Sequence, residues 1–208
     1  MADVERHEFF PTCLYRFKHE FKDNELNGML KHIENNSFEE KDGLMFKRTG
    51  SQTQDELHKI DTFSNLIKKI IEVSDHILDE QGYMGEVEIT NMWGNILRPQ
   101  SQRAHHPHTH SNNFLSGVFY LKTSTDTSPI QFFDPRPQSD VLKPRKKEFN
   151  TLNSNIAQFN SETGWGVIFP SWLLHWVPET KDERISIAWN AIVRGDYGEP
   201  NTLQNVHI

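Results

Sequence analysis

Two histidine-bearing stretches of this chain have the residue types and spacing of a mononuclear metal site. Residues 105–110 read HHPHTH, and residues 172–186 contain a further histidine, His175. On an extended chain, side chains two residues apart leave the same face about 6.5–7 Å apart at Cα, so His108 and His110 could bind adjacent positions of one ion. The third ligand must come from another strand, and His175 lies in an apolar, aromatic segment that can supply it.

The second stretch also holds two residues that suit an organic acid. Arg184 and Ser186 follow His175 closely and, being two residues apart, share one face of a strand. A guanidinium group matches a carboxylate through parallel N–H donors, and a neighbouring hydroxyl can add another hydrogen bond. This order of residues is what a mononuclear iron site with an acidic cosubstrate needs.

Each of these residues taken alone has a simpler interpretation. The cluster 105–110 could be an exposed histidine-rich loop that binds metal adventitiously. His175 could be a core histidine bonded to backbone, and Arg184 could be a surface ion-pair partner. Only the combination of the two stretches favours a metal site.

The composition of the 208 residues predicts one globular domain with an aromatic-rich core. Hydrophobic residues make up 35% and charged residues 25%, and the chain has 14 Phe and 5 Trp. The net charge of −7 argues against nucleic acid or an anionic membrane surface as a partner. No stretch approaches the about 20 apolar residues of a membrane span, so a cytoplasmic location is expected. The single cysteine, Cys13, excludes an internal disulfide framework.

Residues 1–85 are expected to form a strand, a loop and two helices. The strand is placed at residues 8–18, and apolar residues at helical spacing begin a helix at Asp23. The polar stretch 35–55 is expected to be a loop with one short extended piece. The second helix shows the clearest apolar face and ends at Gly82.

From residue 86 onward the pattern changes to short β-branched and aromatic segments. The expected strands are 86–97, 114–122, 130–134, 154–160, 166–169, 172–177 and 184–194. Many short strands separated by turn residues are typical of a sandwich or barrel. We therefore predict a single α+β, mainly β, domain over residues 1–208. Its double-stranded β-helix (jelly-roll) core covers residues 86–195, the N-terminal helices pack on one sheet, and residues 196–208 form an irregular tail.

The ordered motifs of residues 86–193 resemble those of Fe(II)/2-oxoglutarate-dependent oxygenases. The similarity is to microbial and phage members related to prolyl hydroxylases. The segments that carry it are 93–96 (WGNI), 108–121 (HTHSNNFLSGVFYL), 133–136 (FDPR), 164–177 (GWGVIFPSWLLHWV) and 184–190 (RISIAWN).

The resemblance implies a role for each matching residue. His108 and His175 would be iron ligands, Arg184 would pair with the distal carboxylate of 2-oxoglutarate, and Ser186 would hydrogen-bond the same group. Three further polar residues could complete the cosubstrate pocket or could equally be satisfied core groups: Asn95, Tyr120 and Asn190.

His110 departs from the family's pattern. The superfamily usually places Asp or Glu there, which gives a triad of two histidines and one carboxylate. A third histidine would make the iron centre one charge unit more positive. Asp134 is the alternative carboxylate, although a turn residue or a substrate contact is the preferred interpretation. Halogenation would need a small residue at this position and is disfavoured, because His110 is large and a capable ligand.

The implied activity is an Fe(II)- and 2-oxoglutarate-dependent dioxygenase that uses O2 to hydroxylate an unactivated C–H bond. The substrate could be a peptidyl residue such as proline or a small molecule, and residues 35–58 and 135–150 are candidate substrate-facing loops. Trp172, Trp176 and Trp189 could shield His175 from water, or each could equally fill the core.

Two alternatives to this activity stay open. One is a cupin-type three-histidine metal dioxygenase or isomerase that does not use 2-oxoglutarate. The other is a non-catalytic jelly-roll module that binds a metal. The sequence also leaves the oligomeric state open, with a homodimer as one option. For a viral protein the expected location would be the host cytoplasm.

Overall fold

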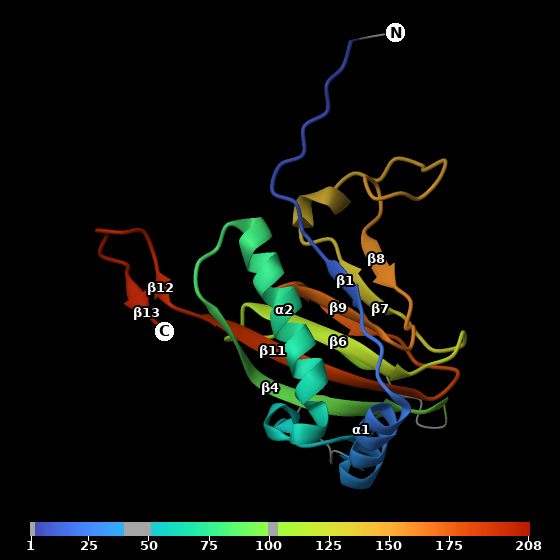
Figure 1. Cartoon of the computed structure of the whole chain (residues 1–208). Coiled ribbons are helices and arrows are strands. Elements are labelled where there is room, and N and C mark those ends of the chain that lie inside the picture. The colour runs from blue at the N-terminus through green and yellow to red at the C-terminus, as the bar shows by residue number, and fades with distance from the viewer. Residues whose placement is uncertain (1–2, 40–50, 100–103) are drawn as a thin grey trace.

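The structure, a computed structural model, describes residues 3–39, 51–99 and 104–208, which form two facing β-sheets with helices outside one of them (Figure 1). The two predicted helices are α1 (Asp23–Asn36) and α2 (Ser64–Gln81). Two short 3-10 turns, η1 (Leu57–Lys59) and η2 (Asp61–Phe63), precede α2. Gly82 ends α2 with a left-handed φ of 72°, a conformation that favours glycine.

The larger sheet has seven strands in the order β1-β9-β6-β11-β4-β3-β2. These are β1 (Tyr15–Lys18), β9 (Trp165–Pro170), β6 (Leu115–Lys122), β11 (Arg184–Arg194), β4 (Glu86–Leu97), β3 (Ser51–Gln52) and β2 (Phe38–Glu39). The smaller sheet has the order β5-β10-β7-β8. Its strands are β5 (His105–His108), β10 (His175–Val177), β7 (Ile130–Phe133) and β8 (Ile156–Phe159). All neighbours in both sheets are antiparallel, and the predicted jelly-roll core is confirmed.

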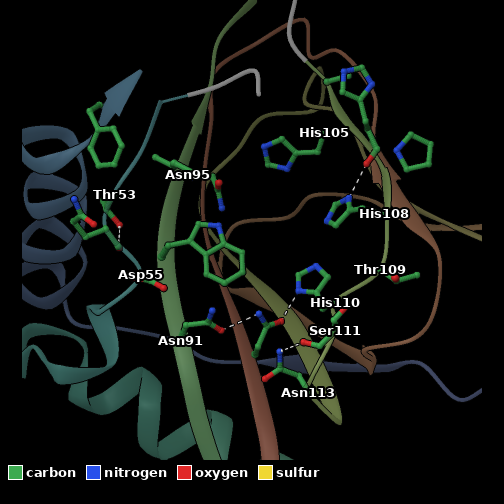
Figure 2. A pocket seen from close by; sticks show the side chains of 18 residues that line it. Thr53, Asp55, Asn91, Asn95, His105, His108, Thr109, His110, Ser111 and Asn113 are labelled. Carbon is green, nitrogen blue, oxygen red and sulfur yellow. Dashed lines mark hydrogen bonds between the residues drawn. The ribbon is translucent and has the colours of Figure 1, made fainter. Parts of the chain in front are cut away.

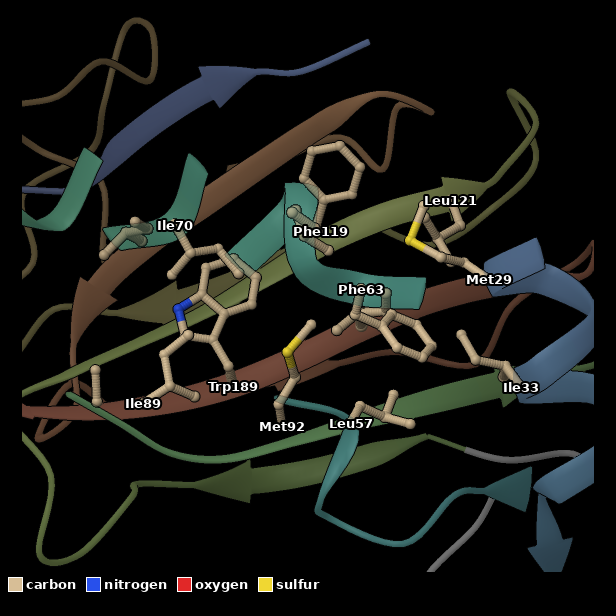
Figure 3. Close-up of a cluster of buried hydrophobic side chains, with 14 of the residues drawn as sticks. Met29, Ile33, Leu57, Phe63, Ile70, Ile89, Met92, Phe119, Leu121 and Trp189 are labelled. Carbon is tan, nitrogen blue, oxygen red and sulfur yellow. The ribbon is translucent and has the colours of Figure 1, made fainter. Parts of the chain in front are cut away.

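The larger sheet separates two layers of core. Side chains alternate between the faces of a strand, so Ile187 and Trp189 of β11 face the helices, where they join Ile33 and Phe63 (Figure 3). A Cβ on Gly117 of β6 would lie 2.2 Å from the Trp189 ring, so only glycine fits there.

The other face of the larger sheet looks toward the smaller one. Its apolar members include Val118, Val167 and Phe169, which pack against Phe132. On β11 the same face carries the alternate residues Arg184, Ser186, Ala188 and Asn190. The fold therefore places a row of polar β11 side chains between the two sheets.

Several segments differ from their prediction. The strand expected at 8–18 is only β1, because Phe9 and Phe10 are exposed and Pro11 has no N–H for a sheet ladder. The tail is not wholly irregular, since a hairpin pairs β12 (Asp196–Tyr197) with β13 (Val206–His207).

The predicted loop 35–55 contributes β2 and β3 to the edge of the larger sheet, and residues 40–50 of it lie outside the described residues. Strand β5, which carries part of the histidine cluster, was not among the predicted strands. In the described part of the chain, neither α1 nor α2 is long and apolar enough to cross a membrane.

Candidate metal centre and acid pocket

The structure brings three of the clustered and distant histidines together between the sheets. His108 ends β5 and lies directly opposite His175, the first residue of β10. His110 lies just past β5, and its backbone N–H donates to the Ser171 carbonyl at 2.9 Å. Among the described residues, their side chains form the group whose candidate ligand atoms all lie within 4.8 Å of one another. One ion can therefore contact all three.

Hydrogen bonds determine which ring nitrogen of each histidine can bind a metal. The Nδ1 atoms of His108 and His175 each contact the backbone carbonyl two residues earlier, at 2.6 and 2.9 Å. The Nδ1 atom of His110 contacts the side-chain oxygen of Asn190 at 2.5 Å. Because an oxygen acceptor requires a proton on Nδ1, the lone pair lies on Nε2 in each ring. The Nε2 atom of His110 is buried without a hydrogen-bond partner, which a bound metal would provide.

The imidazoles of His175 and His110 are neutral at physiological pH. Burial, with a smaller contribution from neighbouring His108, lowers the pKa of His175 to about 3 and that of His110 to about 4. The Phe169 ring supplies part of the apolar surrounding, with its centroid 4.6 Å from that of His175. Neutral imidazole is the form that binds metals, so the three residues present fit a divalent ion.

A cavity of about 710 Å³ opens onto His108 and His110 (Figure 2). One wall is β4, whose alternate side chains Asn91, Trp93 and Asn95 all line it. The Trp93 ring stacks on His110, with centroids 6.1 Å apart. Of the two predicted substrate-facing loops, residues 52–55 line the cavity, whereas none of the described residues between 135 and 150 does.

Arg184 lies buried between the same two sheets. Its side chain is 1% exposed, and the guanidinium donates from Nε to Ser161 Oγ at 3.2 Å and from Nη1 to Ser186 Oγ at 3.1 Å. It also lies 4.9 Å from the centre of the Tyr120 ring, whose hydroxyl is buried and unpaired. No carboxylate of the described residues pairs with Arg184. Since a buried charge without a counter-ion is costly, an acidic ligand suits this position.

The cross-strand register arranges the remaining polar residues in two rows across β4, β11 and β6. The serine row consists of Asn95, Ser186 and Tyr120, and the asparagine row consists of Asn91, Asn190 and Ser116. The rows are four residues apart along β11, or about 13 Å. The three residues predicted together as possible cosubstrate contacts are thus divided, because Asn95 and Tyr120 flank Ser186 while Asn190 contacts His110.

Asp134, the alternative carboxylate, does not belong to the histidine group. Its side chain accepts hydrogen bonds from the backbone N–H of Arg136 and from the guanidinium of the same residue, at 2.9–3.0 Å. These bonds lower the pKa of Asp134 to about 2. The contacts support its interpretation as a turn residue.

The tryptophans do not form a wall around His175, and Trp189 fits the alternative of core filling. Trp172 is 57% exposed, Trp176 bonds to a glutamine of β7 on the outer face of the smaller sheet, and Trp189 faces the helices. The ring of Phe169 contacts His175 instead. This phenylalanine was not among the predicted site residues, and neither were Trp93, Ser116 and Ser161. Strict alternation along β4 and β9 could have placed both aromatic residues on the inner face.

The comparisons with known proteins agree with this geometry. Residues 91–190 match the model of a family described as "Putative 2OG-Fe(II) oxygenase". No curated protein matches the sequence. The chain is similar in structure to a prolyl-4-hydroxylase from Pseudomonas putida, at 11% identity over 88% of this chain and 94% of that one, with a TM-score of 0.59.

Two further solved structures resemble the chain. One is the viral collagen prolyl hydroxylase of Paramecium Bursaria Chlorella virus-1 with 2OG, at 13% identity over 86% of this chain and 96% of that one, with a TM-score of 0.53. The other is the alpha-ketoglutarate-dependent epimerase SnoN from nogalamycin biosynthesis, at 10% identity over 92% of this chain and 83% of that one, with a TM-score of 0.64. Such identities show the fold alone. With the family match, they confirm the resemblance seen in the sequence motifs.

Proposed function

We propose that the chain is a 2OG-Fe(II) oxygenase, as the match of residues 91–190 to that family's model supports, and that it hydroxylates an unactivated C–H bond of a substrate held in the cavity beside His108 and His110. The family uses Fe(II), 2-oxoglutarate and O2. The observation that carries the proposal is that a three-histidine group and a buried arginine without a carboxylate partner lie between the same two sheets. The chain thus offers one site for a metal and another for an organic acid.

One group of residues would bind the metal and another would bind the cosubstrate. The Nε2 atoms of His108, His110 and His175 would hold Fe(II), while Arg184 and Ser186 would hold the distal carboxylate of 2-oxoglutarate. When bound, these groups supply an oxidation in which O2 places one oxygen atom in succinate, formed from 2-oxoglutarate with loss of carbon dioxide, and the other in the substrate C–H bond.

The serine row would complete the acid pocket. Tyr120 brings a buried hydroxyl without a partner, and Asn95, 4% exposed, lines the cavity directly opposite Ser186. Between the two rows lies Ala188, which is partly accessible although its β11 neighbours are buried. Its small side chain leaves space for the carbon chain of a ligand that reaches from Arg184 toward the histidines.

The cavity walls bear on the substrate class. Half of their described residues carry neutral amides or hydroxyls. The others include four histidines, the rings of Trp93 and Phe38 and one carboxylate, Asp55, with no lysine or arginine among them. Such walls suit a neutral, hydrogen-bonding substrate, and we propose a peptide segment whose reacting residue, such as proline, lies against Trp93. The likeness to two prolyl hydroxylases supports this class. A small polar molecule would use the same contacts.

Anaerobic titration of the Fe(II)-loaded protein with 2-oxoglutarate tests the proposal. We expect a weak visible metal-to-ligand charge-transfer band, absent in His175→Ala and much weaker in Arg184→Ala, and succinate formation when air is admitted. Arg98→Ala is the matched control, because this exposed arginine pairs with Glu183 at the end of the same strand pair and should leave the band unchanged.

Three outcomes of this titration point elsewhere. If iron-loaded protein gives neither band nor succinate, the proposal is wrong. Binding of metal without any binding of 2-oxoglutarate would favour a cupin-type three-histidine enzyme. Tight zinc binding with no reaction toward oxygen would favour a structural metal module.

A further inference from the structure

We propose that Asn190 is a positioning residue that holds His110 in the tautomer able to bind a metal. The inference rests on the proposed function only in taking His110 as a ligand. It gives Asn190 a different task from the cosubstrate contact expected from the sequence. It also explains how a histidine beyond the end of β5 can be held as firmly as the other two.

The Asn190 amide is oriented by contacts on both of its sides. Its Oδ1 accepts hydrogen bonds from Nδ1 of His110 at 2.5 Å and from the hydroxyl of Ser116 at 2.7 Å. Its Nδ2 donates to Oδ1 of Asn91 at 2.8 Å. Asn190 is 5% exposed and Ser116 fully buried, so water does not replace these partners readily. The oxygen of the amide is therefore the atom presented to His110.

This orientation decides where the imidazole carries its proton. An amide oxygen only accepts, so Nδ1 of His110 carries the hydrogen and Nε2 keeps a lone pair. If the amide were turned over, its NH2 group would face Nδ1, the proton would move to Nε2, and no lone pair would remain for a metal. The orphaned, buried Nε2 atom of His110 agrees with the first arrangement.

Ser171 connects the ring and the backbone of His110. Its carbonyl accepts the His110 backbone N–H at 2.9 Å, and its hydroxyl lies 2.8 Å from that of Ser116, which in turn donates to Asn190. The turn between β9 and β10 thus fixes both ends of the histidine. Because β10 also begins with His175, the same turn sets the distance between two of the three proposed ligands.

The Asn190 side chain accepts a hydrogen bond from Nδ1 of His110, as backbone carbonyls do from Nδ1 of His108 and His175. A metal-bound histidine generally donates its second N–H to a carboxylate, a carbonyl or water, and loss of that partner typically costs about 10–100-fold in metal affinity or activity. A side-chain amide supplies the acceptor without adding a charge. The centre therefore keeps three neutral ligands and three neutral partners.

Nuclear magnetic resonance of the metal-free protein, with nitrogen-15 in the histidine rings, tests the tautomer directly. We expect His110 to carry its proton on Nδ1 in the natural protein and on Nε2 in Asn190→Ala. Asn190→Asp retains an oxygen acceptor and should retain the Nδ1 proton. Asn95→Ala is the matched control for the tautomer, because this amide lies on the same cavity wall without a hydrogen bond to His108, His110 or His175, and the His110 proton should stay on Nδ1.

Binding of Co(II), measured without 2-oxoglutarate, gives the second readout. Asn190→Ala should weaken binding about 10–100-fold, whereas Asn190→Asp and Asn95→Ala should stay near the natural protein. Should Asn190→Ala fail to fold, Asn91→Ala removes one of the two side chains that orient the amide and leaves Asn190 in place, and it should give a mixture of tautomers. An Nε2 proton on His110 in the natural protein would overturn the inference, as would an Nδ1 proton that persists in both Asn190→Ala and Asn91→Ala. Neither result depends on whether iron and 2-oxoglutarate react, so failure of the proposed function remains distinguishable.

Discussion

In the proposed ligand set, His110 takes the place of the carboxylate in the usual triad of two histidines and one carboxylate. Three neutral imidazoles leave the metal one charge unit more positive than that triad does. The dianion of 2-oxoglutarate, drawn toward both this metal and Arg184, would then supply all of the negative charge at the centre. The substitution thus increases the importance of the acid pocket for charge compensation.

The choice between His110 and Asp134 as third ligand can be decided by a pair of variants. His110→Ala should lower Fe(II) affinity at least tenfold, because it removes a ligand whose Nε2 atom has no other partner. Asp134→Ala should leave the affinity unchanged, because its carboxylate is bonded to Arg136. Calorimetric titration under anaerobic conditions measures both. The reverse pattern would identify a carboxylate triad and exclude our ligand set.

The elements that carry the site could be predicted from the sequence to different degrees. The apolar periodicity of α1 and α2 and the β-branched character of β4, β6 and β11 are local signals, and these elements were predicted. Strand β5 was not, because its sequence HHPH has low strand propensity and pairs with β10 only through the tertiary fold.

The contacts of Asn190 could not be predicted from the sequence either. Its partners His110 and Asn91 lie 80 and 99 residues away in the chain. The pairing of β11 with β4 shifts register between Asn190 and Ala191, a bulge that no local pattern indicates. In contrast, the spacing of Arg184 and Ser186 alone was enough to place both on one face, and the structure joins them by a hydrogen bond.

The packing of β6 against β11 allows a test of the larger sheet. Gly117→Ala would place a methyl group 2.2 Å from the Trp189 ring, and we expect it to destabilise the fold by about 1–3 kcal/mol through overpacking. Gly28→Ala in α1 is the control, because its new methyl group would meet only Thr62 at 3.4 Å, and helix propensity should make it neutral or stabilising. Urea unfolding measures both. Equal urea midpoints for the two variants would show that the Trp189 ring moves aside at little cost in stability.

At the scale of the whole molecule, the proposed metal site joins the two sheets. His108 and His175 come from adjacent strands of the smaller sheet, while His110 is tied to the larger sheet through Asn190 of β11. Between these points apolar packing between the two sheets is interrupted, because the cavity and the polar side chains of β11 also lie there. A bound ion would therefore hold the two layers together where apolar packing is interrupted.

Metal binding should consequently raise the thermal stability of the entire domain. A ligand that binds only the folded state at 100 times its dissociation constant stabilises by about 2.7 kcal/mol, which for a chain of this size corresponds to a rise in Tm of about 5–11 °C. We expect Co(II) to produce such a rise in the natural protein and none in His175→Ala. Asn190→Ala should show a smaller rise at the same metal concentration, because its weaker affinity leaves less binding energy to couple to folding. Differential scanning calorimetry with and without metal measures the effect. If Co(II) raised the Tm of His175→Ala as much as that of the natural protein, the stabilising ion would be bound elsewhere on the molecule, and the histidines would not be the bridge between the sheets.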